Sequence, residues 1–156
     1  MELFHFLLII HIISGCICLV TGAISSMATK RRGIHTLIGE IYHGAFVAIF
    51  ITSVAMGIMH WSQSAYLLFI GIFSYSIALY GYLSKKLRWN NWLGKHIGGM
   101  LGSYIAIITA VLVVNGPNIP LIKQLPTLLL WFLPTIIGTP IIILIGKRYK
   151  RAKKLS

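Results

Sequence analysis

The chain has 156 residues, of which 57% are hydrophobic and only 10% are charged. A soluble domain carries about 25% charged residues, so this chain has too few ionised side chains to cover a surface in water. A net charge of +12 would suggest nucleic-acid binding in a soluble protein. Here the cations lie in short clusters between long apolar runs, which is typical of a membrane protein. We therefore expect an all-α bundle in lipid and no nucleic-acid partner.

Apolar segments long enough to cross a bilayer, about 20 residues each, recur along the whole chain. Short polar or basic stretches separate them, and Asn115-Gly116-Pro117 breaks the helix before the last one. The five predicted transmembrane helices cover residues 3–28, 36–59, 65–83, 92–114 and 125–145. They form one predicted domain over residues 1–146, which a basic tail follows over residues 147–156.

The basic residues predict how the chain is threaded. Of fourteen Lys and Arg residues, three follow the first span, four follow the third and six lie in the tail. The opposite side has only Lys123. Because cytoplasmic loops carry an excess of Lys and Arg, we expect the N-terminus outside and the C-terminus in the cytoplasm. An odd number of spans agrees with this orientation.

Small residues recur at helical spacing and predict where helices pack closely in lipid. In the first span the predicted contact face is His11, Gly15, Cys18 and Gly22. In the fourth span it is His96, Gly99, Ser103, Ala106 and Ala110, with a neighbouring G-x-x-x-G stripe of Gly94, Gly98 and Gly102 that also permits a dimer. Pro134 and Pro140 lie inside the fifth span and indicate a kink there.

Histidines inside a bilayer are energetically costly and mark candidate functional sites. At 1.5 Å per residue, His43 lies about 10 Å and His96 about 6 Å into their helices from the cytoplasmic side, and His11 about 12 Å from the outer side. Two imidazoles on different helices can hold a haem iron from opposite sides. His43 with His96 is the preferred pair, His35 can replace either, and His11 with His60 is an outer alternative. The plainer interpretation is that these histidines only form hydrogen bonds between helices.

Glu40 and His43 form an E-x-x-H pair on one helix face. A di-metal site in a helical bundle needs two such pairs, and the sequence has one. The pair can serve as a proton relay. Alternatively, Glu40 forms an ion pair at the interface with Arg31, Arg32, Lys95 or Arg88. The sequence contains no nucleophile elbow, phosphate loop, C-x-x-C motif or acidic cluster, so no hydrolase or transferase is indicated and enzymatic activity stays open.

Several segments resemble a family of small bacterial multi-pass membrane proteins of unknown function. They are His11-xxx-Gly15, KRRGIHTLIGEIYH, FSYSIALYGYL, HIGGMLGSYIAIITAVLVVNGP and WFLPTIIGTP, and together they extend over most of the chain. The resemblance implies a location in the bacterial cytoplasmic (inner) membrane. The layout is similar to that of membrane b-type cytochromes, which hold haem between helices.

Three functions follow as hypotheses. The leading one is a redox protein that binds b-type haem and passes electrons between a quinone and a partner protein. The second is a small proton-coupled transporter that uses Glu40 and His43, which an interrupted fifth helix would favour. The third is a non-catalytic scaffold or assembly factor, whose basic tail also attracts anionic lipid headgroups.

Overall fold

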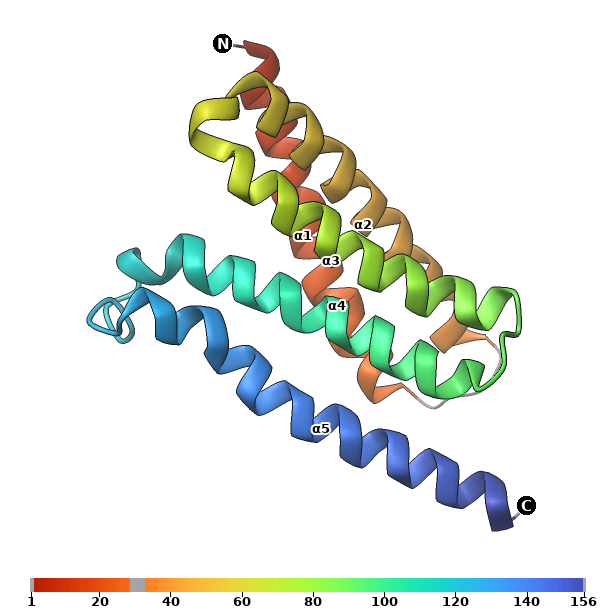
Figure 1. Cartoon of the computed structure of the whole chain (residues 1–156). Helices are drawn as coiled ribbons and strands as arrows, with labels where there is room; N and C mark the ends of the chain where they lie inside the picture. Colours follow the sequence, from red (N-terminus) through yellow and green to blue (C-terminus); the bar gives the residue numbers. More distant parts are fainter. Residues whose placement is uncertain (1, 29–32, 156) are drawn as a thin grey trace. The chain divides into compact units, whose positions relative to one another are not determined.

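The computed structural model describes residues 2–28 and 33–155 and is shown in Figure 1. These residues form no strand, and their helices are α1 (Glu2–Met27), α2 (Ile34–Met59), α3 (Trp61–Lys86), α4 (Trp92–Asn115), the short 3-10 helix η1 (Gly116–Asn118) and α5 (Thr127–Leu155). Within this described part, five helical segments of 23 to 27 residues are long and apolar enough to cross a membrane. Such segments span about 35–40 Å, against about 30 Å for the hydrocarbon core. The prediction of an all-α chain with five helices long and apolar enough to span a membrane is confirmed for the residues described.

The first difference from the prediction lies at the turn between α2 and α3. We predicted a polar turn over residues 60–63, but α3 begins at Trp61, so His60 alone separates the two helices. The backbone N–H of His60 donates to the Met56 carbonyl at 3.1 Å, and the N–H of Ser64 donates to the His60 carbonyl at 2.9 Å. Helical hydrogen bonding therefore continues almost without interruption through this turn.

The second difference lies at the end of α3. The predicted loop began at Ser84, but α3 continues to Lys86 and the Ser84 side chain is fully buried. Its hydroxyl donates to the Gly81 carbonyl at 2.8 Å, which satisfies a polar group that would otherwise be costly to bury. At the other end of the chain, α5 continues to Leu155 and takes in the sequence that we predicted as a basic tail.

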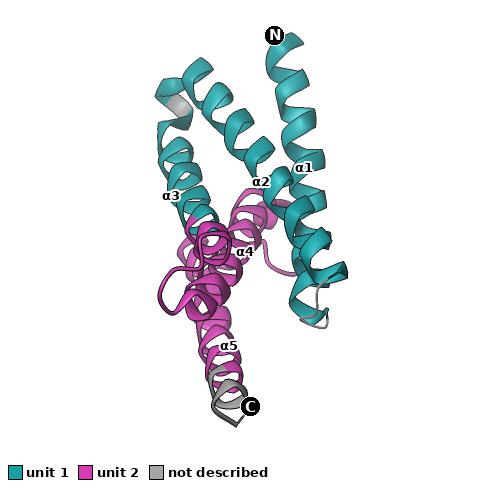
Figure 2. Cartoon of the chain, turned by 90° about the vertical axis from the view of Figure 1, so that its right-hand side faces the viewer, with its two compact units in different colours: residues 1–79 teal, residues 80–156 magenta. Residues whose placement is uncertain are grey.

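The chain forms two compact units, residues 1–79 and residues 80–156, which Figure 2 colours separately. The boundary falls inside α3, so each unit contains part of that helix. The prediction of one domain over residues 1–146 stays a prediction.

In the first unit, α1 and α2 pack against each other in antiparallel directions. The α1 residues that touch α2 recur every seventh position, a spacing that keeps one seam facing a neighbouring helix. The contacting pairs are Phe4–His60, His11–Thr52, Cys18–Tyr42 and Ser25–His35. Of the predicted face, His11 and Cys18 lie on this seam. Gly15 does not, because a Cβ placed there would meet nothing within 4 Å, and Ser14 is the buried small residue instead.

The first part of α3 packs against α2, also in antiparallel directions. A Cβ on Gly57 would lie 3.2 Å from the Leu68 Cβ, and a Cβ on Gly71 would lie 3.6 Å from the Ser53 Cβ. One turn further, the Phe50 and Tyr75 rings stack at 4.5 Å. Glycines thus allow close approach near the α2–α3 turn, and aromatic rings fill the wider space beyond it.

In the second unit the closest backbone approach joins Gly81 of α3 to Gly99 of α4. A Cβ on Gly81 would lie 2.8 Å from the Gly99 carbonyl carbon and 2.7 Å from the Met100 nitrogen. The predicted face is correct at Gly99 and Ser103, which are both buried, whereas Ala110 is exposed. The neighbouring G-x-x-x-G stripe does not make this contact, since a Cβ on Gly98 would meet nothing within 4 Å.

The rest of the second unit is an antiparallel pair formed by α4 and α5. A Cβ on Gly138 would overlap the Ile105 side chain, so this glycine of α5 leaves room for an isoleucine of α4. Both Pro134 and Pro140 lie inside α5, which is one continuous helix from Thr127 to Leu155. The fifth helix is therefore not interrupted at its prolines.

Candidate functional site

His96 lies at the start of α4 and bonds directly to α3. Its Nδ1 atom is 3.0 Å from the carbonyl oxygen of Gly81. A carbonyl oxygen can only accept a hydrogen bond, so Nδ1 must carry the proton and donate it. In the neutral ring the lone pair then belongs to Nε2. The fold therefore selects one tautomer of His96.

The glycines around His96 make this bond possible. Because neither Gly81 nor Gly99 has a side chain, α3 and α4 approach closely enough for the imidazole to reach a main-chain carbonyl. The Gly81 carbonyl also accepts the hydroxyl of Ser84 at 2.8 Å. The Ser84 hydroxyl in turn lies 3.4 Å from the Trp92 carbonyl at the start of α4. Main-chain and side-chain contacts thus both define where the His96 ring lies.

His11 adopts the same tautomer for a different reason. Its Nδ1 is 3.0 Å from the hydroxyl oxygen of Thr52 and 3.5 Å from that of Ser53. The single Thr52 hydroxyl proton is used within α2, toward the carbonyls of Ala48 at 2.8 Å and Ile49 at 3.0 Å. Thr52 must therefore accept from His11, whose lone pair is left on Nε2. Thr52 was not predicted as a partner of His11, although a threonine inside an apolar helix is a recognisable candidate.

His43 has aromatic surroundings. Its ring stacks with the Tyr75 ring at a centroid distance of 6.2 Å and an interplanar angle of 23°. Phe50 stacks on Tyr75 at 4.5 Å, and Phe46 approaches Tyr75 at 6.2 Å. The Tyr75 ring thus joins His43 to a cluster of aromatic side chains from α2 and α3.

The remaining histidines lie near the ends of the helices. His35 Nδ1 is 3.2 Å from the Ser25 hydroxyl, and the His60 ring packs edge-on against Phe4 at 4.6 Å. His11 is level with Thr52, and His60 follows Thr52 by eight residues, about 12 Å along the helix axis. The pairing of His11 with His60 stays a prediction.

The preferred pair draws on both units of the chain. His43 and Glu40 lie in the first unit and His96 in the second, so the pairing of His43 with His96 stays a prediction. The same holds for Glu40 with Arg88 or Lys95. Arg31 and Arg32, the other proposed partners of Glu40, lie outside the described residues.

Comparison with known proteins adds no assignment to this geometry. The chain matches no family model, no curated protein and no solved structure. The chemistry of the site therefore has to be interpreted from the side chains themselves, and the family resemblance in the sequence stays a prediction.

Proposed function

We propose that this chain is a multi-pass protein of the bacterial cytoplasmic membrane that binds b-type haem between its helices and passes electrons between a quinone and a partner protein. The observation that supports this best is the bond from His96 Nδ1 to the Gly81 carbonyl. Histidines that bind metals almost always donate their second ring N–H to a carbonyl or carboxylate, which fixes the ring and leaves Nε2 to ligate. His96 makes the first of these contacts, the bond from Nδ1 to a carbonyl.

The set of donors fits a haem better than a bare divalent cation. A b-type haem takes neutral imidazoles from two different helices, and the chain offers His96 with His43, with His35 or His11 as the alternative second ligand. When bound, the haem supplies a one-electron couple. The bond to the Gly81 carbonyl orients the His96 ring, and the tight contact of Gly81 with Gly99 limits how far that ring can move.

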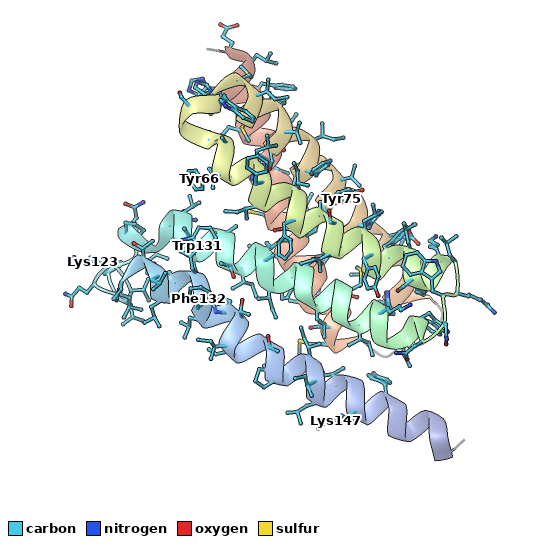
Figure 3. All side chains as sticks on the ribbon, viewed as in Figure 1. Tyr66, Tyr75, Lys123, Trp131, Phe132 and Lys147 are labelled. Atoms are coloured by element: carbon cyan, nitrogen blue, oxygen red, sulfur yellow. The ribbon has the colours of Figure 1, made fainter. Side chains whose placement is uncertain are left out.

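The distribution of cations supports an outside N-terminus and a cytoplasmic C-terminus. Within the second unit α4 and α5 are antiparallel, so the first residues of α4 and the last residues of α5 lie at the same end. Lys147 lies toward that end of α5, and Lys123 lies at the opposite end, between α4 and α5 (Figure 3). The positive-inside rule assigns the cation-rich end to the cytoplasm.

The transporter alternative loses one of its arguments. Transporters often bind their substrate where a helix is discontinuous in the middle of the membrane. Here α5 is one helix through both Pro134 and Pro140. Glu40 and His43 remain on one face of α2 as a proton relay, but the haem proposal also gives a role to His96, whose bond to a carbonyl is typical of metal-binding histidines.

Visible absorption of the purified protein tests the haem proposal. The protein is expressed with a haem precursor, purified in detergent and recorded oxidised and reduced. We expect a Soret band that shifts on reduction, with haem content measured as the pyridine complex. A colourless wild-type protein that is helical by circular dichroism and takes up no added haemin would overturn the proposal.

His96→Asn is the most informative variant. The asparagine amide nitrogen can occupy the position of Nδ1 and donate to Gly81, whereas nothing replaces Nε2. We therefore expect normal folding with loss of the Soret band. His60→Ala is the matched control, because it removes an imidazole that packs on Phe4 at the α2–α3 turn, and it should keep its haem. Full haem content in His96→Asn would exclude His96 as a ligand.

A further inference from the structure

The turn between α3 and α4 concentrates positive charge that the neighbouring chain cannot neutralise. We call residues 85–95 the basic turn; its cations are Lys85, Lys86, Arg88 and Lys95. Residues 80–156 contain no Asp or Glu, and the whole chain has two such residues against fourteen Lys and Arg. The two carboxylate side chains can therefore pair with only a small part of these cations. This excess of positive charge does not depend on the haem proposal.

The backbone of the basic turn presents Arg88 in an unusual conformation. The N–H of Trp89 donates to the Ser84 carbonyl at 3.1 Å and the N–H of Arg88 to the Lys85 carbonyl at 3.4 Å, which is the Schellman pattern that ends a helix. Arg88 holds the left-handed position, with φ 49°, where glycine is the usual residue. A cation kept in a strained conformation on an exposed turn suggests a role for its side chain.

Aromatic rings hold the neighbouring cations in place. The Lys95 ammonium lies 5.6 Å from the centre of the Trp89 ring, whose other neighbour is Tyr80 at 5.5 Å. The Lys86 ammonium lies 5.2 Å from the centre of the Tyr82 ring. Tryptophan and tyrosine prefer the membrane–water interface, at the depth of the lipid headgroups. The basic turn therefore places its cations where lipid phosphates are found.

We propose that the basic turn is a binding site for the phosphate of an anionic phospholipid. Arg88 is the principal donor, because its planar guanidinium can give two parallel hydrogen bonds to a phosphate. Lys85 and Lys95 add positive charge on either side of it. Trp89 packs against the lipid at the level where its headgroup meets the acyl chains. This proposal is more specific than general attraction of cations to the membrane surface, since Arg88 is a defined hydrogen-bond donor and Trp89 is a defined aromatic contact.

Native mass spectrometry of the full chain with phosphatidylglycerol or phosphatidylcholine tests the site. We expect wild-type protein to retain phosphatidylglycerol in preference. Arg88→Gln should weaken that binding about fivefold, the share of one cation at a membrane surface. A charge-matched comparison replaces four cations by glutamine either in the basic turn or at Lys147, Arg148, Lys150 and Arg151 of α5. Only the first replacement should abolish the preference.

Three other outcomes would contradict the proposal. Equal losses in the two fourfold variants would mean general electrostatic attraction without a site. Equal retention of both lipids by wild type would exclude recognition of the anionic headgroup. Stabilisation by inorganic phosphate as large as that by phosphatidylglycerol would exclude the lipid as the specific ligand.

The conservative variant Arg88→Lys keeps the charge and the fold, so it should lose less phosphatidylglycerol binding than Arg88→Gln. Circular dichroism checks folding in every variant.

Discussion

Gly81 and Gly98 differ sharply in what surrounds them, so the same substitution by alanine should affect them differently. At Gly81 a Cβ would meet the backbone of Gly99 and Met100 at less than 3 Å, and backbone atoms cannot move aside cheaply. We expect Gly81→Ala to destabilise the protein by about 2 kcal/mol, the usual cost of overpacking. Gly98→Ala should be neutral or slightly stabilising, because nothing lies within 4 Å. Thermal unfolding in detergent, followed by tryptophan fluorescence, measures both changes. Equal effects would contradict the close contact at Gly81.

At Arg88 we expect the opposite effect, because removing this side chain should raise the stability of the protein. An L-residue in the left-handed conformation costs about 1–2 kcal/mol, and glycine avoids that cost. Arg88→Gly should therefore raise the unfolding free energy in zwitterionic detergent by about 1 kcal/mol. Arg88→Lys serves as control and should show no gain, since lysine has the same backbone preference. An unchanged or lowered stability in Arg88→Gly would mean that the Arg88 side chain supports the fold itself.

At the scale of elements, the α1–α2 seam depends on few polar contacts between long apolar helices. The bond between His11 and Thr52 is one of them, and such bonds contribute about 0.6 kcal/mol on average and up to about 1.7 kcal/mol in membrane proteins. A double-mutant cycle of His11→Leu and Thr52→Val should give a coupling energy in that range. Ser76→Ala is the control, because its hydroxyl donates only within α3. A coupling energy of zero would contradict the contact.

The sequence predicted the helices well because each one must satisfy its own backbone in lipid. Apolar length alone therefore located α1, α2 and α4 to within about two residues. Apolar length did not predict the turns correctly. His60 and Ser84 are polar residues, but helical hydrogen bonding continues through both positions. The small residues of α4 predicted its contact face correctly at Gly99 and Ser103, but they did not separate this face from the neighbouring stripe at Gly98. Gly98 and Gly99 are equally small, and only the position of Gly81 on the neighbouring helix decides which of them makes contact.

The candidate site was predictable only in part. The cost of burying an imidazole singled out His11, His43 and His96 from the sequence. Their partners did not follow, because a carbonyl such as that of Gly81 has no sequence signature. The stacking of His43 on Tyr75 depends on the register of α2 against α3, which apolar periodicity leaves open. The sequence therefore indicated three candidate histidines, and the structure supplied the tautomers of His11 and His96 and a ring neighbour of His43. Their role as ligands stays a prediction.

At the scale of the whole molecule, the orientation of the chain in the membrane is a proposal on which most of the other proposals depend. Cations gather after the first span, in the basic turn and at the end of α5, whereas Lys123 is alone between α4 and α5. Moving the cation-rich segments across a bilayer is unfavourable, so they should stay in the cytoplasm. Single substitutions Arg88→Cys, Lys123→Cys and Lys147→Cys report this directly when a membrane-impermeant thiol reagent is added to cells. The native Cys16 and Cys18 lie inside α1, and wild-type protein gives the background.

We expect Lys123→Cys to react in intact cells, and Arg88→Cys and Lys147→Cys to react only after the membrane is permeabilised. The reverse pattern would invert the orientation but keep the number of spans. If Arg88→Cys and Lys147→Cys react from opposite sides of the membrane, the predicted number of crossings is wrong as well. The antiparallel pair of α4 and α5 returns the chain to the side from which it started, so these two positions must share a side if both helices cross the membrane. Labelling from opposite sides would therefore exclude five crossings, and with them the depths at which His43 and His96 were placed as haem ligands.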